Sequence, residues 1–183
     1  MKIEKMLSQH KRDLLKKWFH LILQTYPEET AKFLTNEKDP FTNPVGSTIL
    51  KGIEELFEKL IKESDYQQIP SFLDRIIHIR ATQDFTPSQA LSFLFMLKKV
   101  IREEFKKDLN DKGFFEELLI FESKIDELGL AAFNLYMECR EKIYKLRANE
   151  VKNRYSGLLR RLNLVYEIAE EDNQPTFKKS EAQ

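Results

Sequence analysis

The sequence has little of what disulfide-linked, sheet-rich or membrane-spanning proteins need. Its 183 residues include one cysteine, Cys139, which excludes an internal disulfide and suits a reducing compartment. Only 5 glycines and 6 prolines are present, too few for a fold with many tight turns. No apolar run approaches the roughly 18 residues that cross a bilayer, and the first residues do not resemble a signal peptide. We therefore expect a cytoplasmic protein without direct membrane insertion.

The chain also lacks an excess of either charge. Lys plus Arg number 30 and Asp plus Glu number 30, whereas a nucleic-acid-binding protein usually shows a basic excess. We therefore expect no nucleic-acid partner. Charged residues make up 33% of the chain, above the usual share of about 25%. Together with the scarcity of glycine, this charge content favours long solvated helices and an all-α fold.

Apolar residues recur at three- and four-residue spacing in five segments of the first hundred residues, as they do in amphipathic helices. These segments predict a helix over about 4–25, a short helix after Pro27, and helices that begin near Asn43, Pro70 and Pro87. Asn43 is expected to cap its helix. Thr86 to Gln89 form a capping box with proline at the first helical position. The helix that follows is apolar on most sides, which places it in the centre of the core.

A longer helix is predicted after Gly113, because only two glycines and no proline occur before about residue 172. An apolar stripe from Leu118 to Cys139 is followed by a charged stretch, and the stripe then resumes at Tyr155, Leu158, Leu162 and Val165. Two interpretations stay open: the helix continues as a coiled coil, or a bend near Gly157 folds it back. We expect a domain over 1–147, a helical extension over 148–172 and a disordered tail over 173–183. Because an amphipathic helix of this kind needs a partner, we also expect a homodimer that uses the helix from about residue 115 onwards.

Catalytic and metal-binding motifs are absent from the sequence: it has no phosphate-binding glycine loop, CxxC, HExxH or GxSxG. We therefore predict no enzyme activity, no metal and no cofactor. His78, in the segment IIHIR, could supply the axial imidazole of a haem, which would make the chain a globin-like sensor with haem or another apolar ligand in its core. The other interpretation is a hydrogen-bonded core or boundary histidine. Cys139 lies at a core position of the stripe and is expected to be a buried, inert thiol.

Three segments resemble the RsbRD N-terminal domain family: WFHLILQTYPEETAKFL, DPFTNPVGSTILKGIEEL and IIHIRATQDFTPSQALSFLFMLKKVIREE. The resemblance covers about residues 10–147. It implies a globin-like, haem-free, dimeric sensory domain of the kind found in RsbT co-antagonist proteins of bacterial stressosomes. In those proteins a STAS domain follows, and we expect none here because too few residues remain after 172. The resemblance also implies an unknown protein partner in signalling or in a membrane redox complex, since stand-alone relatives occur beside such complexes in sulfate-reducing bacteria.

Polar residues gather just before the capping box, and with Asn43 they form the predicted ligand or interface site: Asn43, Arg80, Gln83, Asp84 and Thr86. We expect the loop 36–44 and the junction 80–89 to pack near one another or near a partner. For Arg80 and Asp84, an ion pair across one helical turn is the simpler interpretation. The function that follows is that of a non-catalytic sensory or regulatory domain that acts through protein–protein interaction.

Overall fold

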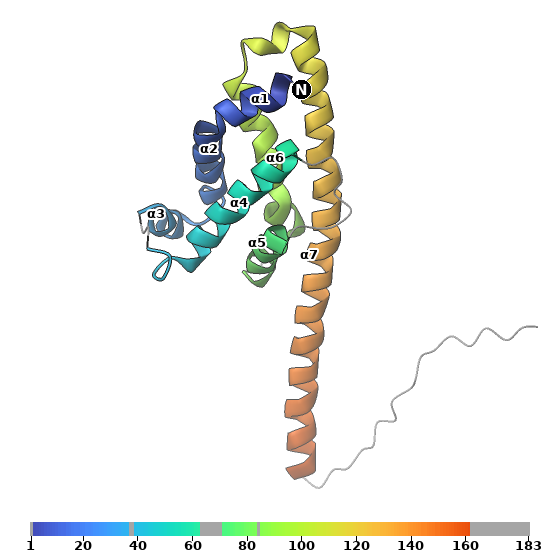
Figure 1. Cartoon of the computed structure of the whole chain (residues 1–183). Coiled ribbons are helices and arrows are strands. Elements are labelled where there is room, and N and C mark those ends of the chain that lie inside the picture. Colours follow the sequence, from blue (N-terminus) through green and yellow to red (C-terminus); the bar gives the residue numbers. More distant parts are fainter. Residues whose placement is uncertain (1, 37–38, 63–70, 84, 162–183) are drawn as a thin grey trace, which may run out of the picture. The chain divides into compact units, whose positions relative to one another are not determined.

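The computed structural model describes residues 2–36, 39–62, 71–83 and 85–161, and every regular element in these ranges is a helix (Figure 1). The predicted all-α fold with a long last helix is confirmed. The α-helices and one 3₁₀ turn, η1, run in the order α1 (Lys2–Gln9), α2 (Lys11–Leu23), α3 (Glu28–Asn36), α4 (Pro44–Lys62), α5 (Ser71–Thr82), α6 (Pro87–Glu104), η1 (Asp108–Asn110) and α7 (Lys112–Arg161). Contacts divide the chain into two units, residues 1–143 and 144–183. The expected tail, 173–183, lies outside the described residues.

The first predicted helix, about 4–25, is wrong as a single element, because α1 and α2 meet at a break at His10. His10 has φ −98° and ψ 9°, outside helical geometry. Its ring Nδ1 lies 2.9 Å from the carboxylate of Glu104, and its ring packs edge-on against Phe105 at 5.1 Å between centroids. These two contacts with the end of α6 hold His10 out of the helix, and spacing along one segment could not reveal them.

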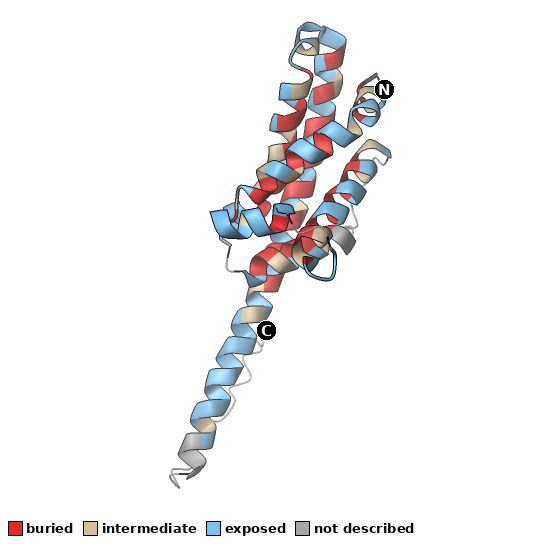
Figure 2. Ribbon diagram, turned by 90° about the vertical axis from the view of Figure 1, so that its left-hand side faces the viewer, coloured by how far each residue is buried: buried red, intermediate tan, exposed pale blue. Residues whose placement is uncertain are grey.

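The core of the first unit forms where α2 packs on α6 and α4 packs on α5. Figure 2 shows the buried residues lining the inner faces of these helices. Trp18 of α2 is fully buried, and its ring Nε1 donates a hydrogen bond to the carbonyl of Phe93 at 2.6 Å. Because a buried indole N–H would be costly without a partner, this bond fixes the register of α2 on the central helix α6.

The start of α6 matches its prediction. Thr86 is the N-cap, its side chain accepts from the backbone N–H of Gln89, and the Gln89 side chain accepts from the Thr86 N–H at 3.0 Å. Such a reciprocal cap satisfies two backbone donors that a helix start otherwise leaves open. Pro87 takes the first helical turn. The capping box therefore ends the α5–α6 junction sharply and fixes where the core helix begins.

The loop between α3 and α4 is closed by Asn43, as predicted for the cap. The Asn43 side chain accepts from the Gly46 N–H at 2.8 Å and donates to the carbonyl of Leu34 at 3.1 Å. A β-carbon added at Gly46 would lie 2.4 Å from the Asn43 amide nitrogen. Asn43, which is 3% exposed, thus joins the end of α3 to the start of α4, and a glycine at 46 leaves room for it.

The predicted stripe on α7 is buried in the first unit by the chain's own helices. Its buried members are Leu118, Phe121, Ile125, Leu128, Ala132 and Cys139. A bidentate ion pair supports the α6–α7 contact, with Arg102 Nε and Nη2 each 2.6 Å from the Glu122 carboxylate. This face of α7 is therefore already covered and cannot also be the seam of a homodimer.

The second unit is described from Tyr144 to Arg161, where α7 stays helical through Gly157. The helix is therefore not interrupted at Gly157, and the residues after Arg161, which a helix folded back would involve, lie outside the described residues. Side chains from 144 to 157 are exposed, apart from the half-buried Ser156. In the part of the chain that the structure describes, no helix is both long enough and apolar enough to cross a bilayer.

Candidate functional site

The junction between α5 and α6 is built around Arg80, whose side chain is fully buried. Its two terminal nitrogens donate to the Gln89 carbonyl at 2.9 Å and to the Thr25 hydroxyl at 3.1 Å. The guanidinium also lies over three aromatic rings, with its carbon 5.5, 5.0 and 5.3 Å from the centroids of Tyr26, Phe85 and Phe93. Cation–π contacts of this kind help to offset the loss of water around a buried charge. Arg80 therefore joins α2, α5 and α6 at one point.

The charge of Arg80 is held in an environment of neutral groups among its described contacts. Burial lowers the pKa of Arg80, and the neighbouring Tyr26 hydroxyl opposes that change. Burial likewise raises the pKa of Tyr26, and Arg80 opposes it. Although the two groups are neighbours, Arg80 Nε and the Tyr26 hydroxyl each lack a hydrogen bond of good geometry in the described structure. The predicted Arg80–Asp84 pair cannot be assigned, since Asp84 lies outside the described residues.

Two residues of α7 hold the same junction from the other side. The Tyr136 hydroxyl donates to the carbonyl of Phe85, and Arg140 donates to the carbonyl of Ala81 at 2.9 Å. Tyr136 is 2% exposed. The sequence analysis missed both residues, because their partners are backbone carbonyls, which leave no mark in a sequence. One turn of α7, just before the second unit, is thus hydrogen-bonded to the predicted site.

His78 lies on α5 with a half-exposed side chain, so it is a boundary histidine. Its Nε2 is 3.4 Å from the sulfur of Cys139, and its Nδ1 is 3.2 Å from a carboxylate oxygen of Asp74. Both ring nitrogens thus have a neighbour in the described structure, and the hollow that His78 lines with Ile79, Thr82 and Gln83 is open to solvent. Cys139 is the predicted buried thiol, and burial raises its pKa. A raised pKa disfavours the thiolate form that a nucleophile needs, so burial opposes a nucleophilic role for Cys139.

Two further members of the predicted site, Asn43 and Gln83, lie close together. Asn43 and Gln83 line one small hollow of about 190 Å³, which brings the loop 36–44 and the junction 80–89 side by side. Tyr26, Phe33 and Val45 complete its mostly apolar wall. Asn43 and Thr86 serve as helix caps. Among the described residues, no group of three or more His, Cys, Asp or Glu side chains could hold a metal ion.

A second feature of the first unit is an apolar surface on the outer sides of α6 and α7, which we call the outer face. It consists of Phe95, Leu130, Phe133 and Met137, which are 44%, 72%, 44% and 39% exposed. A groove of about 690 Å³ runs beside it, lined by Leu91, Phe95, Met96 and Phe133 among others. The Phe95 ring lies over Gly129, with its tip 2.7 Å from where a β-carbon would stand. A cluster of exposed apolar side chains often marks a surface that binds another molecule.

The predicted dimer or output residues of the last helix are described only in part. Tyr155 lies on α7 and is 64% exposed. Leu158 also lies on α7, and Leu162 and Val165 lie outside the described residues. The outer face and Tyr155 are thus among the exposed apolar parts of α7. The others among the described residues are Phe115, Leu119, Ile120, Tyr144, Leu146 and Val151.

Comparison with known proteins bears directly on the resemblance. A curated relative, an uncharacterized protein of Archaeoglobus fulgidus, is 29% identical over 109 residues, which is 56% of this chain and 68% of the relative. No solved structure matches the chain. The model of the RsbT co-antagonist protein rsbRD N-terminal domain matches residues 12–151, which include the α5–α6 junction, the outer face and the turn of α7 that holds the junction. The chain therefore belongs to the family of RsbT co-antagonist protein rsbRD N-terminal domains.

Proposed function

We propose that this protein is a non-catalytic sensory or regulatory domain whose α5–α6 junction controls α7, and that it acts by binding other protein chains. Membership of a family of sensory and regulatory domains supports this function. The observation that carries it is the pair of bonds from Tyr136 and Arg140 to the carbonyls of Phe85 and Ala81. They join the predicted site to the helix that continues into the second unit.

The arrangement has the physical requirements of a coupling element. Arg80 holds the junction with two hydrogen bonds to neutral oxygens, and it leaves Nε without a good partner. An unpaired polar atom in a buried network costs free energy, which a rearrangement of the junction could recover. Any event that moves the junction must break or lengthen the bonds to α7, since both acceptors are backbone carbonyls of the moving segment. A change at the junction therefore alters the hydrogen bond of Arg140, which lies four residues before the second unit begins.

Hydrogen exchange of the full chain tests this coupling. Arg140→Ala removes one of the two bonds, and we expect faster exchange both in the junction amides, such as Phe85, and in α7 around residues 136–144. Arg154→Ala is the matched control, because Arg154 is an exposed arginine of α7 that pairs only with Glu150 in the described contacts. If Arg140→Ala and Arg154→Ala leave the junction equally protected, the coupling does not exist.

Self-association through the outer face is the second part of the proposal. The buried stripe of α7 is covered within the chain, so a second copy must use an exposed part of α7 after residue 115, and we assign this role to the outer face. Two-fold pairing of identical surfaces is the commonest way to bury such a face. A homodimer built on Phe95, Leu130 and Phe133 would bury aromatic side chains of the kind that dominate interface energetics.

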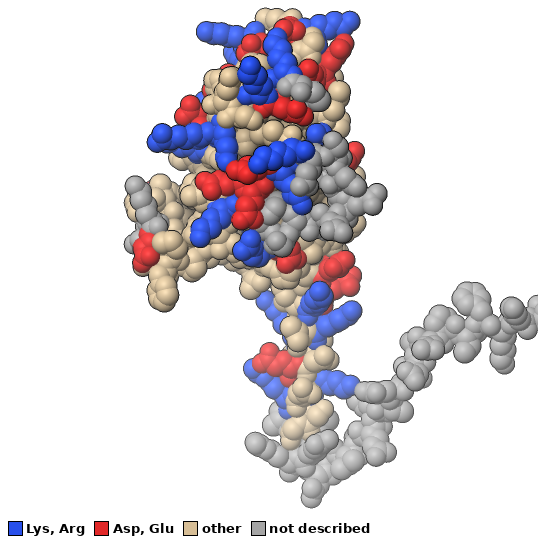
Figure 3. Space-filling model, viewed as in Figure 1, with Lys and Arg blue, Asp and Glu red and all other residues tan. Residues whose placement is uncertain are grey.

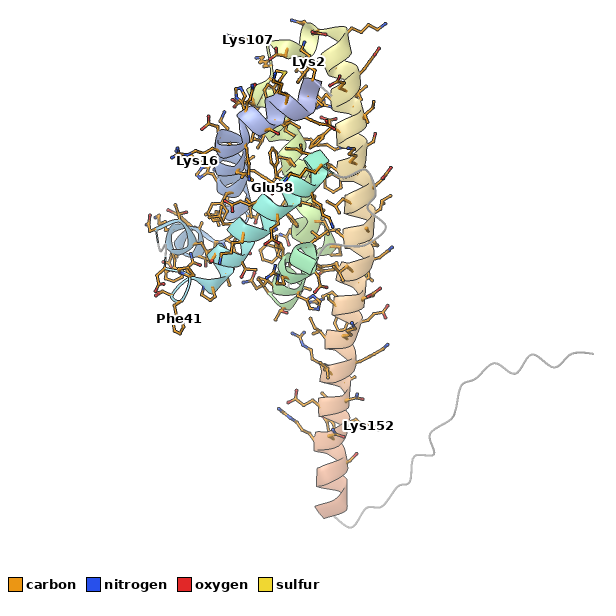
Figure 4. The ribbon with its side chains drawn as sticks, in the orientation of Figure 1. Lys2, Lys16, Phe41, Glu58, Lys107 and Lys152 are labelled. Atoms are coloured by element: carbon orange, nitrogen blue, oxygen red, sulfur yellow. The ribbon has the colours of Figure 1, made fainter. Side chains whose placement is uncertain are left out.

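Sedimentation of the full chain tests the dimer. Phe133→Ser should weaken self-association by about tenfold or more, because a buried interface aromatic typically contributes more than ~1 kcal/mol. Phe41→Ser is the control: Phe41 is 96% exposed and lies in the α3–α4 loop, away from the outer face (Figure 4). A wild-type chain that is monomeric at micromolar concentration, or equal effects of the two variants, would show that the outer face does not pair two copies.

A further inference from the structure

The described part of the second unit, residues 144–161, is strongly basic. Between Tyr144 and Arg161 the sequence has six basic residues and one acidic residue, Glu150, a net charge of +5 in a chain whose total is zero. Lys and Arg atoms predominate along this part of α7 in Figure 3. A basic amphipathic helix is typical of segments that bind an acidic protein or a membrane surface.

Four residues of this basic surface share one line, and the exposed Leu146 lies off it. Tyr144, Val151 and Tyr155 are 56%, 51% and 64% exposed, and Ala148 lies between them on the same face. Their spacings of four, three and four residues are those of a heptad seam. In this register Tyr144 and Val151 take one core position, and Ala148 and Tyr155 take the other. Because an uncovered seam of this length is marginal in water, a second helix must cover it.

The residues that flank the seam determine which kind of helix can cover it. Lys145 and Lys152 follow one core position, and Arg147 and Arg154 precede the other, so all four take the places that set partner choice in coiled coils. All four side chains are exposed, and Lys152 is labelled in Figure 4. Both flanks of the seam are therefore basic over two consecutive heptads.

A second copy of this chain is a poor partner for such a seam. In a parallel pair, Arg147 of one copy would face Lys152 of the other, and in an antiparallel pair each flank would face itself. Like charges in these positions are destabilising. A lipid surface is also a poor fit, since in-plane membrane helices use a broad face of Trp, Phe and Leu, whereas the described seam has two tyrosines, a valine and an alanine. A seven-residue repeat serves pairing with a helix, not contact with a flat surface.

We propose that the segment 144–157 of α7 docks on an acidic helix of a different protein, with apolar residues in its seam and Glu or Asp on both flanks. Arginine on one flank suits such a partner, because a guanidinium can form two parallel hydrogen bonds with one carboxylate. The inference rests on the proposed function, since it names the chemistry of the partner through which α7 acts. Under this proposal, two copies of the chain pair through the outer face, and a different protein binds the segment 144–157.

A charge-reversed variant of this chain can serve as an acidic probe with the same seam. In the full-length variant Lys145→Glu, Arg147→Glu, Lys152→Glu and Arg154→Glu, the seam is unchanged and both flanks are acidic. Mixed with the wild-type chain, it should form mixed pairs in excess of binomial proportions, measured by native mass spectrometry. We expect an excess of about tenfold in the exchange equilibrium, from several exposed ion pairs of a few tenths of a kcal/mol each, and we expect the excess to fall as salt is raised.

A control variant reverses four exposed lysines of the first unit: Lys5, Lys16, Lys106 and Lys107. It has the same net charge as the probe and should mix with the wild-type chain in binomial proportions. Circular dichroism shows whether each variant keeps its helices.

Three results would overturn the proposal. The first is binomial mixing of the charge-reversed probe with the wild-type chain. The second is weaker self-association of the probe than of the wild-type chain, which would mean that the basic segment pairs with its own copy. The third is wild-type binding to vesicles rich in phosphatidylserine that the probe loses while it mixes binomially, which would assign the segment to a lipid surface. Because the outer-face dimer alone mixes binomially and is measured with Phe133→Ser, its failure and the failure of this proposal are distinguishable.

Discussion

The hydroxyl of Tyr136, on α7, donates a hydrogen bond to the backbone carbonyl of Phe85, 51 residues earlier in the chain. Phe85 lies between α5 and α6, and its ring also covers the buried guanidinium of Arg80. One residue of the junction thus contacts both the buried cation and the last helix. This relationship makes the junction a part of the core, although it has the composition of a surface turn.

Removal of the Tyr136 hydroxyl should loosen the junction without emptying the core. Tyr136→Phe keeps the ring and deletes one hydrogen bond, so we expect a loss of about 1 kcal/mol in the free energy of unfolding. Urea denaturation measures it. Tyr155→Phe, on the exposed part of α7, should change stability by less than about 0.5 kcal/mol. Equal effects of the two variants would mean that the hydrogen bond from Tyr136 to the Phe85 carbonyl does not stabilise the fold.

Arg80 should be the most sensitive polar residue of the first unit. Arg80→Ala removes two hydrogen bonds and the packing of three aromatic rings, and we expect it to cost about 3–5 kcal/mol. Arg80→Met keeps much of the volume without the charge, so it should cost clearly less than alanine. Arg75→Ala, an exposed arginine of the same helix with a long 3.6 Å contact to Glu55, is the control. Thermal unfolding that ranks Arg80→Met with or below Arg80→Ala would contradict the packing account.

Two glycines should respond in opposite ways to the same change. Gly46→Ala would push the Asn43 side chain out of its cap, and we expect it to cost about 1–2 kcal/mol. Gly157→Ala meets no atom within 4 Å, and it should stabilise α7 by about 0.5–1 kcal/mol because alanine is the better helix former. Calorimetry of both variants measures the difference. A stable Gly46→Ala protein would show that the cap can be rebuilt.

Acid should weaken the contact between α2 and the end of α6. A hydrogen bond from Lys17, followed by one from His10, lowers the pKa of Glu104 below its ordinary value. A carboxylate with a lowered pKa in the folded state stabilises that state above the unfolded pKa, and the contribution is lost as the pH falls through the folded pKa. We therefore expect Glu104→Gln to reduce stability at pH 7 and to flatten its decline below about pH 4.5.

The control for this acid dependence is the neighbouring residue. Glu103 is 61% exposed in its side chain and has only a 3.9 Å contact with Lys99. Glu103→Gln should leave the stability–pH curve close to that of the wild-type chain. Parallel curves for the Glu104→Gln and wild-type proteins would show that Lys17 and His10 do not act through Glu104.

Local signals in the sequence were sufficient wherever one segment decided its own structure. The capping box at Thr86, the Asn43 cap and the buried stripe of α7 all follow from residues within a few positions of one another, because helix caps and helical faces are set by short-range geometry. These features are readable in the sequence because the backbone repeats every 3.6 residues. The spacing of Tyr144, Ala148, Val151 and Tyr155 also lies within one segment, but the sequence analysis treated the charged stretch before Tyr155 as an interruption of the stripe and did not predict this seam.

Tertiary packing decided the rest. His10 breaks the first predicted helix because Glu104 and Phe105, some 95 residues away, hold its ring. The sequence suggested a local partner for Arg80, Asp84, which lies outside the described residues, but it did not suggest the aromatic rings of Tyr26, Phe85 and Phe93 that surround the guanidinium. Tyr136 and Arg140 bond to backbone carbonyls, which every residue carries and which therefore leave no pattern in a sequence. The sequence by itself determined the helices and their faces, whereas only the packed structure decided which buried polar groups meet, because that depends on distances between segments that no local pattern encodes.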